Sequence, residues 1–438
     1  MDDPIRHPLT HARTERGWSQ PELAREVRRA ALRRGLRSGV ERQRIWKWEN
    51  YRAVPDADSQ ALLAEVFEID RGLVESFDWP HWLPGRDDPL PLGPHSPVPA
   101  LREALRAAMD RRAFLTYSTT GLTGLAQQWA GSEPVAVATT PLEGKTVGAE
   151  LVGLLEATGV HLTELVTEQR QHTRALLDAH LTTVTDLIEH GRYGRAAGRR
   201  LHALAARLSQ TVGWHRFDQD RHAAASRFWH GALHSAYASG DRDLGAGVLS
   251  DLAYQATWLK DPGTAVDILE SAVPRARHPT ARALLHLRLA RARAALNESR
   301  ECHRALAAAE RELGTAALEP APAWCAWMSP ADLLVDSGQC LMDLGRGREA
   351  RRLIREGTTL LPATRSKTRA VFLTSEARSL LHTGEVEQAA RAAKESLALA
   401  ERIGAPRCGA LVRELLPGFA PHRDAEGVPE LLRLAHAH

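Results

Sequence analysis

The chain has little lysine, few cysteines and no long apolar run, and each shortage excludes a class of protein. Only five of its 57 basic residues are lysine, as in proteins from GC-rich, for example actinobacterial, genomes. The four cysteines, Cys302, Cys325, Cys340 and Cys408, form no CxxC pair, so we expect reduced core residues rather than a disulfide framework. No apolar run approaches the roughly 18 residues of a membrane span, so we expect no membrane segment.

Signals for export and for catalysis are also absent. The opening "MDDPIRHPLT" has no apolar region of the signal-peptide kind, so we expect a cytoplasmic protein. No nucleophile–base pair, carboxylate pair or cofactor fingerprint emerges, so we expect neither an enzyme nor a cofactor. His230 and His234 are spaced i, i+4, but Gly231 stands where an HExxH motif has Glu. We expect packed or surface histidines there and no metal.

Length and composition predict a large globular chain of two or three domains. Of its 438 residues 43% are apolar and 25% charged, which is enough for a sizeable core. The net charge is only +3, so any signal for nucleic acid must be local.

Composition along the chain predicts an all-α protein in four parts. Residues 1–80 form a compact helical unit that is basic in its middle. A linker follows at 81–100, since "WPHWLPGRDDPLPLGPHSPVPA" holds seven prolines in 22 residues. Residues 101–174 form a connecting helical region, and 175–438 carry repeats. No segment alternates as a strand would.

The repeats are helix pairs joined by short turns that contain Gly, Asp or Asn. A small residue follows each turn and opens the second helix of the pair. Five such residues are spaced by 40, 37, 48 and 39 positions, namely Ala225, Ala265, Cys302, Ala350 and Ala389. A unit near 34 residues with loop variation is typical of tetratricopeptide (TPR) repeats, in which small residues let paired helices approach closely. The pattern predicts a TPR-like α-solenoid of five to seven helix pairs.

Two helices near the N-terminus carry signals for DNA. In "SQPELAREV", Ser19 is a natural N-cap, Pro21 tolerates the first turn and Glu22 favours the helix dipole. Gln20 therefore lies at the positive end of a helix, where proteins commonly meet a phosphate.

The second helix is predicted over residues 41–49. Ile45 and Trp48 face inward at i, i+3, which leaves Arg42, Gln43, Trp46 and Lys47 outward. Arginine and glutamine can pair bidentately with guanine and adenine edges in the major groove.

These segments resemble the XRE family of lambda-repressor-like helix-turn-helix domains. The similarity covers residues 8 to about 75, from "TERGWSQPELAREV" through "IWKWEN" to "DSQALLAEVFEI". By this resemblance Gln20 touches the DNA backbone, Arg42, Gln43 and Lys47 face bases, and Glu49 is structural.

The chain departs from that family at three places. Glu41 replaces the usual Ser or Thr before the second helix, and Asn50–Tyr51 replaces the usual Gly after it. About eleven extra residues, "RRAALRRGLRS", lie between the two helices and add five arginines. The predicted DNA contacts are Gln20, Arg33, Arg34, Arg37, Arg42, Gln43, Arg44, Trp46, Lys47 and Arg52. The alternative is a solvated arginine face of an ordinary helix.

The whole layout is similar to the TPR-bearing regulators of actinobacteria and to the peptide-responsive RRNPP regulators. That resemblance implies a homodimer that binds palindromic double-stranded DNA and receives a peptide through its repeats, as in quorum sensing. Aromatic residues of the repeats are expected first as core, and some could line a ligand groove. The candidates are Trp214, Arg221, Trp229, Tyr254 and Trp258. Two alternatives stay open, a small-molecule receptor and a scaffold whose repeats bind a partner protein.

Overall fold

The protein, described here by a computed structural model, is built from helices. The structure describes residues 7–50, 52–67, 69, 74, 79–80, 82–83, 89–109, 117, 119–132, 144–164, 167–315 and 320–436. Within these ranges there is no strand, only one isolated bridge between Thr146 and Arg192. The predicted all-α class is confirmed.

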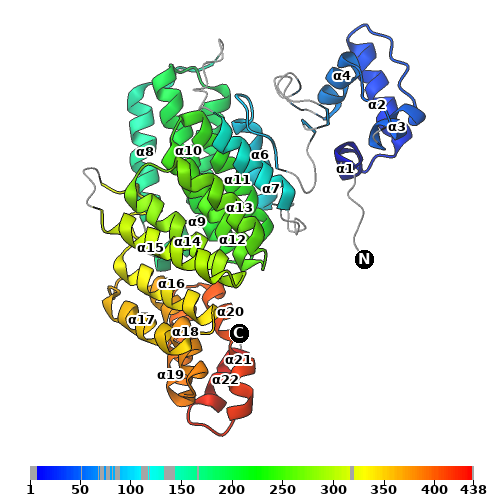
Figure 1. The fold of residues 1–438 in the computed structure, drawn as a ribbon. Helices are drawn as coiled ribbons and strands as arrows, with labels where there is room; N and C mark the ends of the chain where they lie inside the picture. The colour runs from blue at the N-terminus through cyan, green and yellow to red at the C-terminus, as the bar shows by residue number, and fades with distance from the viewer. Residues whose placement is uncertain are drawn as a thin grey trace.

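The first four helices pack around their own core and are drawn in blue in Figure 1. They are α1 (Pro8–Glu15), α2 (Gln20–Arg33), α3 (Arg42–Glu49) and α4 (Ala57–Phe67). Their core contains Leu23, Ile45, Trp48 and Leu63. The sequence pattern suggested a short helix at "SQPELAREV", followed by an inserted stretch before the helix at 41–49. Instead, α2 continues to Arg33, because "RRAALR" favours helix and its Ala30 and Ala31 are buried.

Four helices connect this group to the repeats: α6 (Pro97–Met109), α7 (Thr119–Gly131), α8 (Ala149–Glu164) and α9 (Thr167–His190). Helix α6 packs against α11 and α9, and α7 packs against α13. The start of α6 at Pro97 lies inside the proline-rich stretch, because proline is well tolerated in the first turn of a helix.

Five antiparallel helix pairs follow and stack side by side (Figure 1). Their bounds are α10 (Arg195–Phe217) with α11 (His222–Ser239), α12 (Arg242–Trp258) with α13 (Pro262–Ala272), α14 (Pro279–Ala295) with α15 (Ser299–Leu313), α16 (Pro330–Asp343) with α17 (Gly347–Leu360), and α18 (Ser366–His382) with α19 (Val386–Arg402). Short 3-10 turns lie at Val273–Arg275 and Ala420–His422. The chain ends with α20 (Pro406–Arg413), α21 (Leu416–Phe419) and α22 (Val428–His436). This is the predicted TPR-like solenoid.

The turn inside every pair has the same construction. One residue takes a left-handed conformation, with φ between 60° and 82°: Asp220, Lys260, Asn297, Gly345 and Gly384. In each pair a fully buried small residue follows five positions later. These residues are, in the same order, Ala225, Ala265, Cys302, Ala350 and Ala389. The left-handed residue reverses the chain, and the small residue lets the two helices of the pair approach closely.

The long spacing of 48 positions between Cys302 and Ala350 comes from the connection between α15 and α16. That connection runs from residue 314 to 329, whereas only residues 240–241 join α11 to α12. Trp324 in this connection packs over the backbone of Gly247 in α12, where a Cβ atom would lie 2.6 Å from the indole ring. Trp324 of this connection therefore packs against the apolar core of the first repeats, which also contains Cys325 and Met328.

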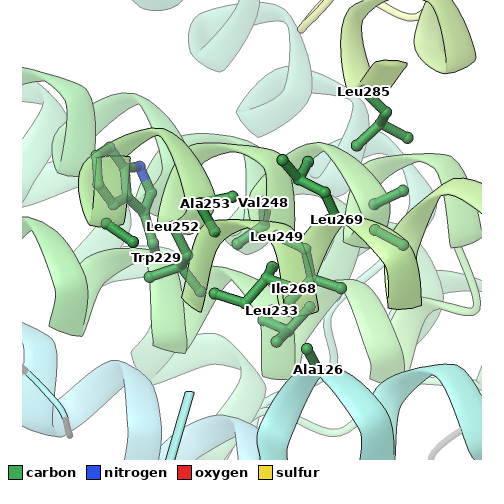
Figure 2. Packing of buried hydrophobic residues seen from close by; sticks show 14 of the residues in the cluster. Ala126, Trp229, Leu233, Val248, Leu249, Leu252, Ala253, Ile268, Leu269 and Leu285 are labelled. Carbon is green, nitrogen blue, oxygen red and sulfur yellow. The ribbon is translucent and has the colours of Figure 1, made fainter. Parts of the chain in front are cut away.

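One large apolar core runs through the first repeats. It joins α7 to pairs α10/α11 and α12/α13 and to α14, and contains Trp229, Leu233, Leu249 and Ile268 (Figure 2). Each pair thus buries the apolar face of the next, as repeat proteins require. Within the described residues no helix is both long and apolar enough to cross a bilayer.

Candidate nucleic-acid interface and inner cluster

Helix α3 presents a polar face to solvent and an apolar face to the core, as predicted. Ile45 is 0% exposed and Trp48 is 2% exposed. The exposed side chains of α3 are Arg42, Gln43, Arg44, Trp46 and Lys47. Trp46 is 46% exposed, which is unusual for a large aromatic residue and leaves its ring free to meet a partner.

Glu49, at the end of α3, fixes this helix to α1 and α2. Its carboxylate accepts hydrogen bonds from Arg13 Nε at 2.6 Å and from Gln20 Nε2 at 2.5 Å. Glu49 itself is buried, so the three helices are held in one orientation by a charge-assisted network. In this structure the Gln20 amide therefore braces α3, while Gln20 remains half-buried at the start of α2.

The five arginines of the inserted stretch divide between structural and exposed positions. Arg28 donates to the Val40 carbonyl oxygen at 2.6 Å and so holds the loop before α3. Arg33 and Arg34 both pair with Glu65 of α4, at 3.1 and 2.7 Å. Arg37 is exposed in the loop before α3, and Arg52, also exposed, follows that helix.

A hollow of about 360 Å³ lies between the beginnings of α2 and α3. It is lined by Pro21, Ala24, Arg28, Ser38, Gly39, Glu41 and Arg42. Its two arginines favour an anion, whereas Glu41, the N-cap residue of α3, opposes one.

A second group of polar and aromatic residues joins distant repeats. We call it the inner cluster, and its members are Trp214, Asp218, Tyr254, Arg288, Lys367 and Arg407. Arg288 lies over the rings of Trp214 and Tyr254, at 5.7 and 4.9 Å from the ring centroids. Most of these residues lie on the first helices of their pairs, namely Trp214 on α10, Tyr254 on α12, Arg288 on α14 and Lys367 on α18.

Ion pairs close the inner cluster. Asp218, in the turn between α10 and α11, accepts a hydrogen bond from Arg407 Nε at 3.1 Å and another from Lys367 Nζ. Burial raises the pKa of Asp218, but these two cations outweigh it and hold that pKa below its ordinary value. Arg407 also donates to the Tyr254 hydroxyl oxygen at 2.9 Å. The last helices are thereby fastened to the first repeat.

The residues predicted to line a ligand groove have different environments. Trp214, Tyr254 and Trp258 are half-buried around the inner cluster, and Arg221 is half-buried at the N-cap of α11. Trp229 is different, because its side chain is fully buried and its indole N–H donates to the Gln210 carbonyl oxygen. As placed here, Trp229 is a core residue and does not line a groove.

A buried histidine pair fastens the segment before α6 to the repeats. His230 and His234 are 0% exposed, their Nε2 atoms lie 2.8 Å apart, and both lie within 3.0 Å of the Leu90 carbonyl oxygen. Ser96 Oγ lies 2.5 Å from His234 Nδ1. Burial lowers the pKa of both histidines, so both are neutral at neutral pH. Of the two predicted settings, packed or on the surface, the structure shows the packed one.

Several inner residues were not anticipated from the sequence. Asp218, Lys367 and Arg407 come from three distant segments, and no spacing rule links them. The one usable signal was a charge flanked directly by leucines, as Arg288 is by Leu287 and Leu289 in "LLHLRLARA". Arg288 is 8% exposed and pairs with Asp251, because a buried charge needs a partner.

Comparisons with known proteins found one family model and several solved structures that are similar to parts of this chain. A family model described as the SP15 N-terminal domain matches residues 9–73, which is less than half of the chain. No curated protein is similar enough to count as a match.

Among solved structures, the chain is similar to a Rap protein complexed with Competence and Sporulation Factor, with TM-score 0.41, 13% identity, and coverage of 66% of this chain and 98% of that one. It is also similar to aspartyl phosphate phosphatase F from Bacillus subtilis, with TM-score 0.38, 12% identity, and coverage of 73% and 85%. A third is the APC/C hetero-tetramer Cut9–Hcn1, with TM-score 0.34, 12% identity, and coverage of 82% and 55%. Scores this low establish neither a shared family nor a shared function.

Proposed function

We propose that the chain is a sequence-specific DNA-binding transcription regulator without enzymatic activity, of the XRE type, acting in the cytoplasm. In this account α3 enters the major groove, and two copies read two half-sites about one helical turn apart, roughly 34 Å. The repeats receive a peptide or small-molecule signal. The predicted effector residues that fit this role are the half-buried Trp214, Tyr254 and Trp258.

The observation that carries the proposal is the two-sided character of α3. Arg42, Gln43 and Lys47 are exposed together on a helix whose opposite face is locked into the core by Ile45, Trp48 and Glu49. A rigidly held helix with guanidinium and amide groups outward suits base readout, because bidentate pairing needs fixed geometry. Exposed Arg37 and Arg52 flank it and suit phosphate contacts.

The test is DNA binding by the full chain at two salt concentrations. A pool of fragments from the source genome should yield one enriched palindromic sequence, which the double variant Arg42→Ala/Gln43→Ala no longer selects. Loss of selection with retained weak, salt-sensitive binding would assign base readout to α3. Binding that the double variant leaves unchanged would refute the assignment.

One observation favours a second function, a protein-interaction scaffold. Exposed Glu41 stands at the N-cap position of α3, where a phosphate would approach, and Arg33 and Arg34 are partly neutralised by Glu65. A scaffold would bind a protein through its repeats and show no salt-sensitive DNA binding. The same salt titration therefore separates the two functions.

A further inference from the structure

Two cysteines lie in contact in the middle of the repeat stack. Cys302 of α15 and Cys340 of α16 are both 0% exposed, and they share a small buried cluster with Ala290 and Ala294 of α14. A hydrogen bond joins their two thiols, and both cysteines are free. Neighbouring thiols are the arrangement that formation of a disulfide requires.

The packing of the helices does not require sulfur at position 302. The equivalent residue is alanine in the other four helix pairs, where a small side chain lets the paired helices approach closely. A lone buried cysteine commonly serves as such a small apolar side chain, but Cys302 meets a second thiol. Its sulfur therefore offers a chemistry that the turn between α14 and α15 does not need.

The two thiols lie on either side of the longest connection between helix pairs. Helix α15 ends the third pair and α16 begins the fourth, and residues 314–329 join them, whereas residues 361–365 suffice to join the fourth pair to the fifth. Helices α15 and α16 also contact each other directly. A bond between the thiols would therefore tie two pairs together at the junction with the most intervening chain.

The surroundings of the pair make its two thiols unequal. The hydrogen bond with Cys340 lowers the pKa of Cys302, and the charge of Arg291 also lowers it, against burial and the charge of Asp343. The hydrogen bond with Cys302, followed by burial, raises the pKa of Cys340 well above its ordinary value, and the charge of Asp336 adds to the rise. Arg291 is hydrogen-bonded to Cys340 and pairs with Asp343 at 3.1 Å. Cys302 is therefore the thiol that ionises first and is the better nucleophile.

We propose that Cys302 and Cys340 form a reversible disulfide when the protein meets a peroxide, and that this bond ties the third helix pair to the fourth. The Cys302 thiolate attacks one peroxide oxygen, the O–O bond breaks, and Cys302 becomes a sulfenic acid as one water leaves. The Cys340 sulfur then attacks the Cys302 sulfur, and its proton leaves with the displaced hydroxyl as a second water. The two thiols lose two electrons in total, and the peroxide gains them.

The remaining cysteines provide a comparison within the same molecule. Cys325 and Cys408 are also 0% exposed, but each is the only cysteine in its own buried cluster. Burial raises the pKa of both thiols, that of Cys325 to about 12. A small peroxide that enters the interior during local opening therefore finds a second thiol in contact with the first only at Cys302 and Cys340.

The experiment counts the free thiols of the reduced full chain before and after treatment with hydrogen peroxide. The thiols are titrated in denaturant, so that burial does not hide them. The count should fall from four to two, the intact mass should fall by two hydrogen atoms, and dithiothreitol should restore both values. Cleavage after Trp327, which separates Cys325 from Cys340, should release a cross-linked peptide pair that contains Cys302 and Cys340.

Single variants identify the two partners. Cys302→Ala introduces the residue of the other four turns and should keep all three of its thiols after peroxide, as should Cys340→Ala. Cys408→Ala is the matched control, because it removes an equally buried thiol, and its count should fall from three to one. Thermal unfolding checks that the reduced variants are folded, and it should show a higher melting temperature for the oxidised wild type than for the reduced one.

Four outcomes would overturn the proposal. These are a wild type that keeps four thiols, a loss of thiols in Cys302→Ala, a cross-link that involves Cys325 or Cys408, and a loss that dithiothreitol does not reverse. Thiol counting needs no DNA, so its result is independent of the DNA-binding test.

Discussion

Asp218 and Arg407 lie 189 positions apart in the chain, yet the Asp218 carboxylate accepts a hydrogen bond of 3.1 Å from the Arg407 guanidinium. Lys367 shares the same carboxylate. The two contacts join the turn of the first repeat to α18 and α20, so one acidic residue links the two ends of the repeat stack.

Asp218→Asn should lower the stability of the repeat domain by about 2–3 kcal/mol. The substitution preserves shape but leaves two cations, one of them buried, without their partner, and breaking such a pair is costly. Thermal unfolding would measure the loss, and small-angle scattering would show a wider stack. Asp220→Asn is the control, since the Asp220 side chain is 83% exposed and a change within about 0.5 kcal/mol is expected. Equal losses in the two variants would contradict the account.

Substitutions at two of the left-handed turn residues are expected to change the stability of the protein in opposite directions. Lys260 has φ 67°, which costs a side-chain-bearing residue about 1 kcal/mol, so Lys260→Gly should stabilise the protein by several tenths of a kcal/mol. Gly384 has φ 82° in open space, so Gly384→Ala should destabilise it by about 1 kcal/mol through the backbone alone. Melting temperatures of the two variants test the shared turn. Shifts of the same sign in both would argue against it.

The small residues of the repeats could be predicted from the sequence, and the turns only in part. Ala225 and Ala389 follow a helix spacing that is visible in one dimension, and both are fully buried. The spacing did not single out Lys260 as left-handed, because lysine has no preference for that conformation. Its conformation follows from the packing of the two helices that it joins.

The ion pairs of the inner cluster could not be predicted, for a related reason. They depend on the curvature accumulated over five repeats, which brings Lys367 and Arg407 back to Asp218. For α3 the local pattern was sufficient, since Ile45 and Trp48 are buried and Arg42 is exposed as expected. The full length of α2 was not predicted. The family resemblance suggested an insertion after "SQPELAREV", whereas the residues that follow favour helix and extend α2 to Arg33.

Acidification should loosen the segment before α6. In the network Ser96 donates to the Gly93 carbonyl oxygen, and the Nε2 atoms of both histidines lie within 3.0 Å of the Leu90 carbonyl oxygen. Tyr117 faces the same pair, as do the charges of Glu103 and Arg227. Protonation of both rings would place two cationic imidazoles in contact in a buried site, with their Nε2 atoms 2.8 Å apart.

The direction of this pH effect on stability follows from the lowered pKa values of both histidines in the folded protein. Their neutral forms stabilise the fold fully above the unfolded pKa near 6.5, and that stability is lost as the pH falls below it. The loss grows as the pH falls from 6.5 toward 5.5. Hydrogen exchange of residues 89–96 at pH 7.5 and 5.5 measures the effect. Protection that is unchanged between these pH values would contradict the prediction.

Glu65→Gln should strengthen non-specific DNA binding severalfold. Removing this carboxylate frees Arg33 and Arg34, which pair with it at 3.1 and 2.7 Å, and adds cationic charge beside the proposed interface. Fluorescence anisotropy over a salt series should give a steeper salt dependence for the variant. Glu356→Gln on α17 removes an acid from the repeats and should change nothing. If the salt dependence of DNA affinity were unchanged in Glu65→Gln, the surface around Arg33 and Arg34 would lie away from DNA.

The most direct test of the central proposal is selection of a DNA sequence by the full chain and by Arg42→Ala/Gln43→Ala. We predict that the wild type enriches one palindrome from a genomic fragment pool, and that the variant binds all fragments weakly, with its affinity lost at high salt. Equal selection by both proteins, or no DNA binding by either at low salt, would contradict the assignment of α3 as the helix that reads DNA.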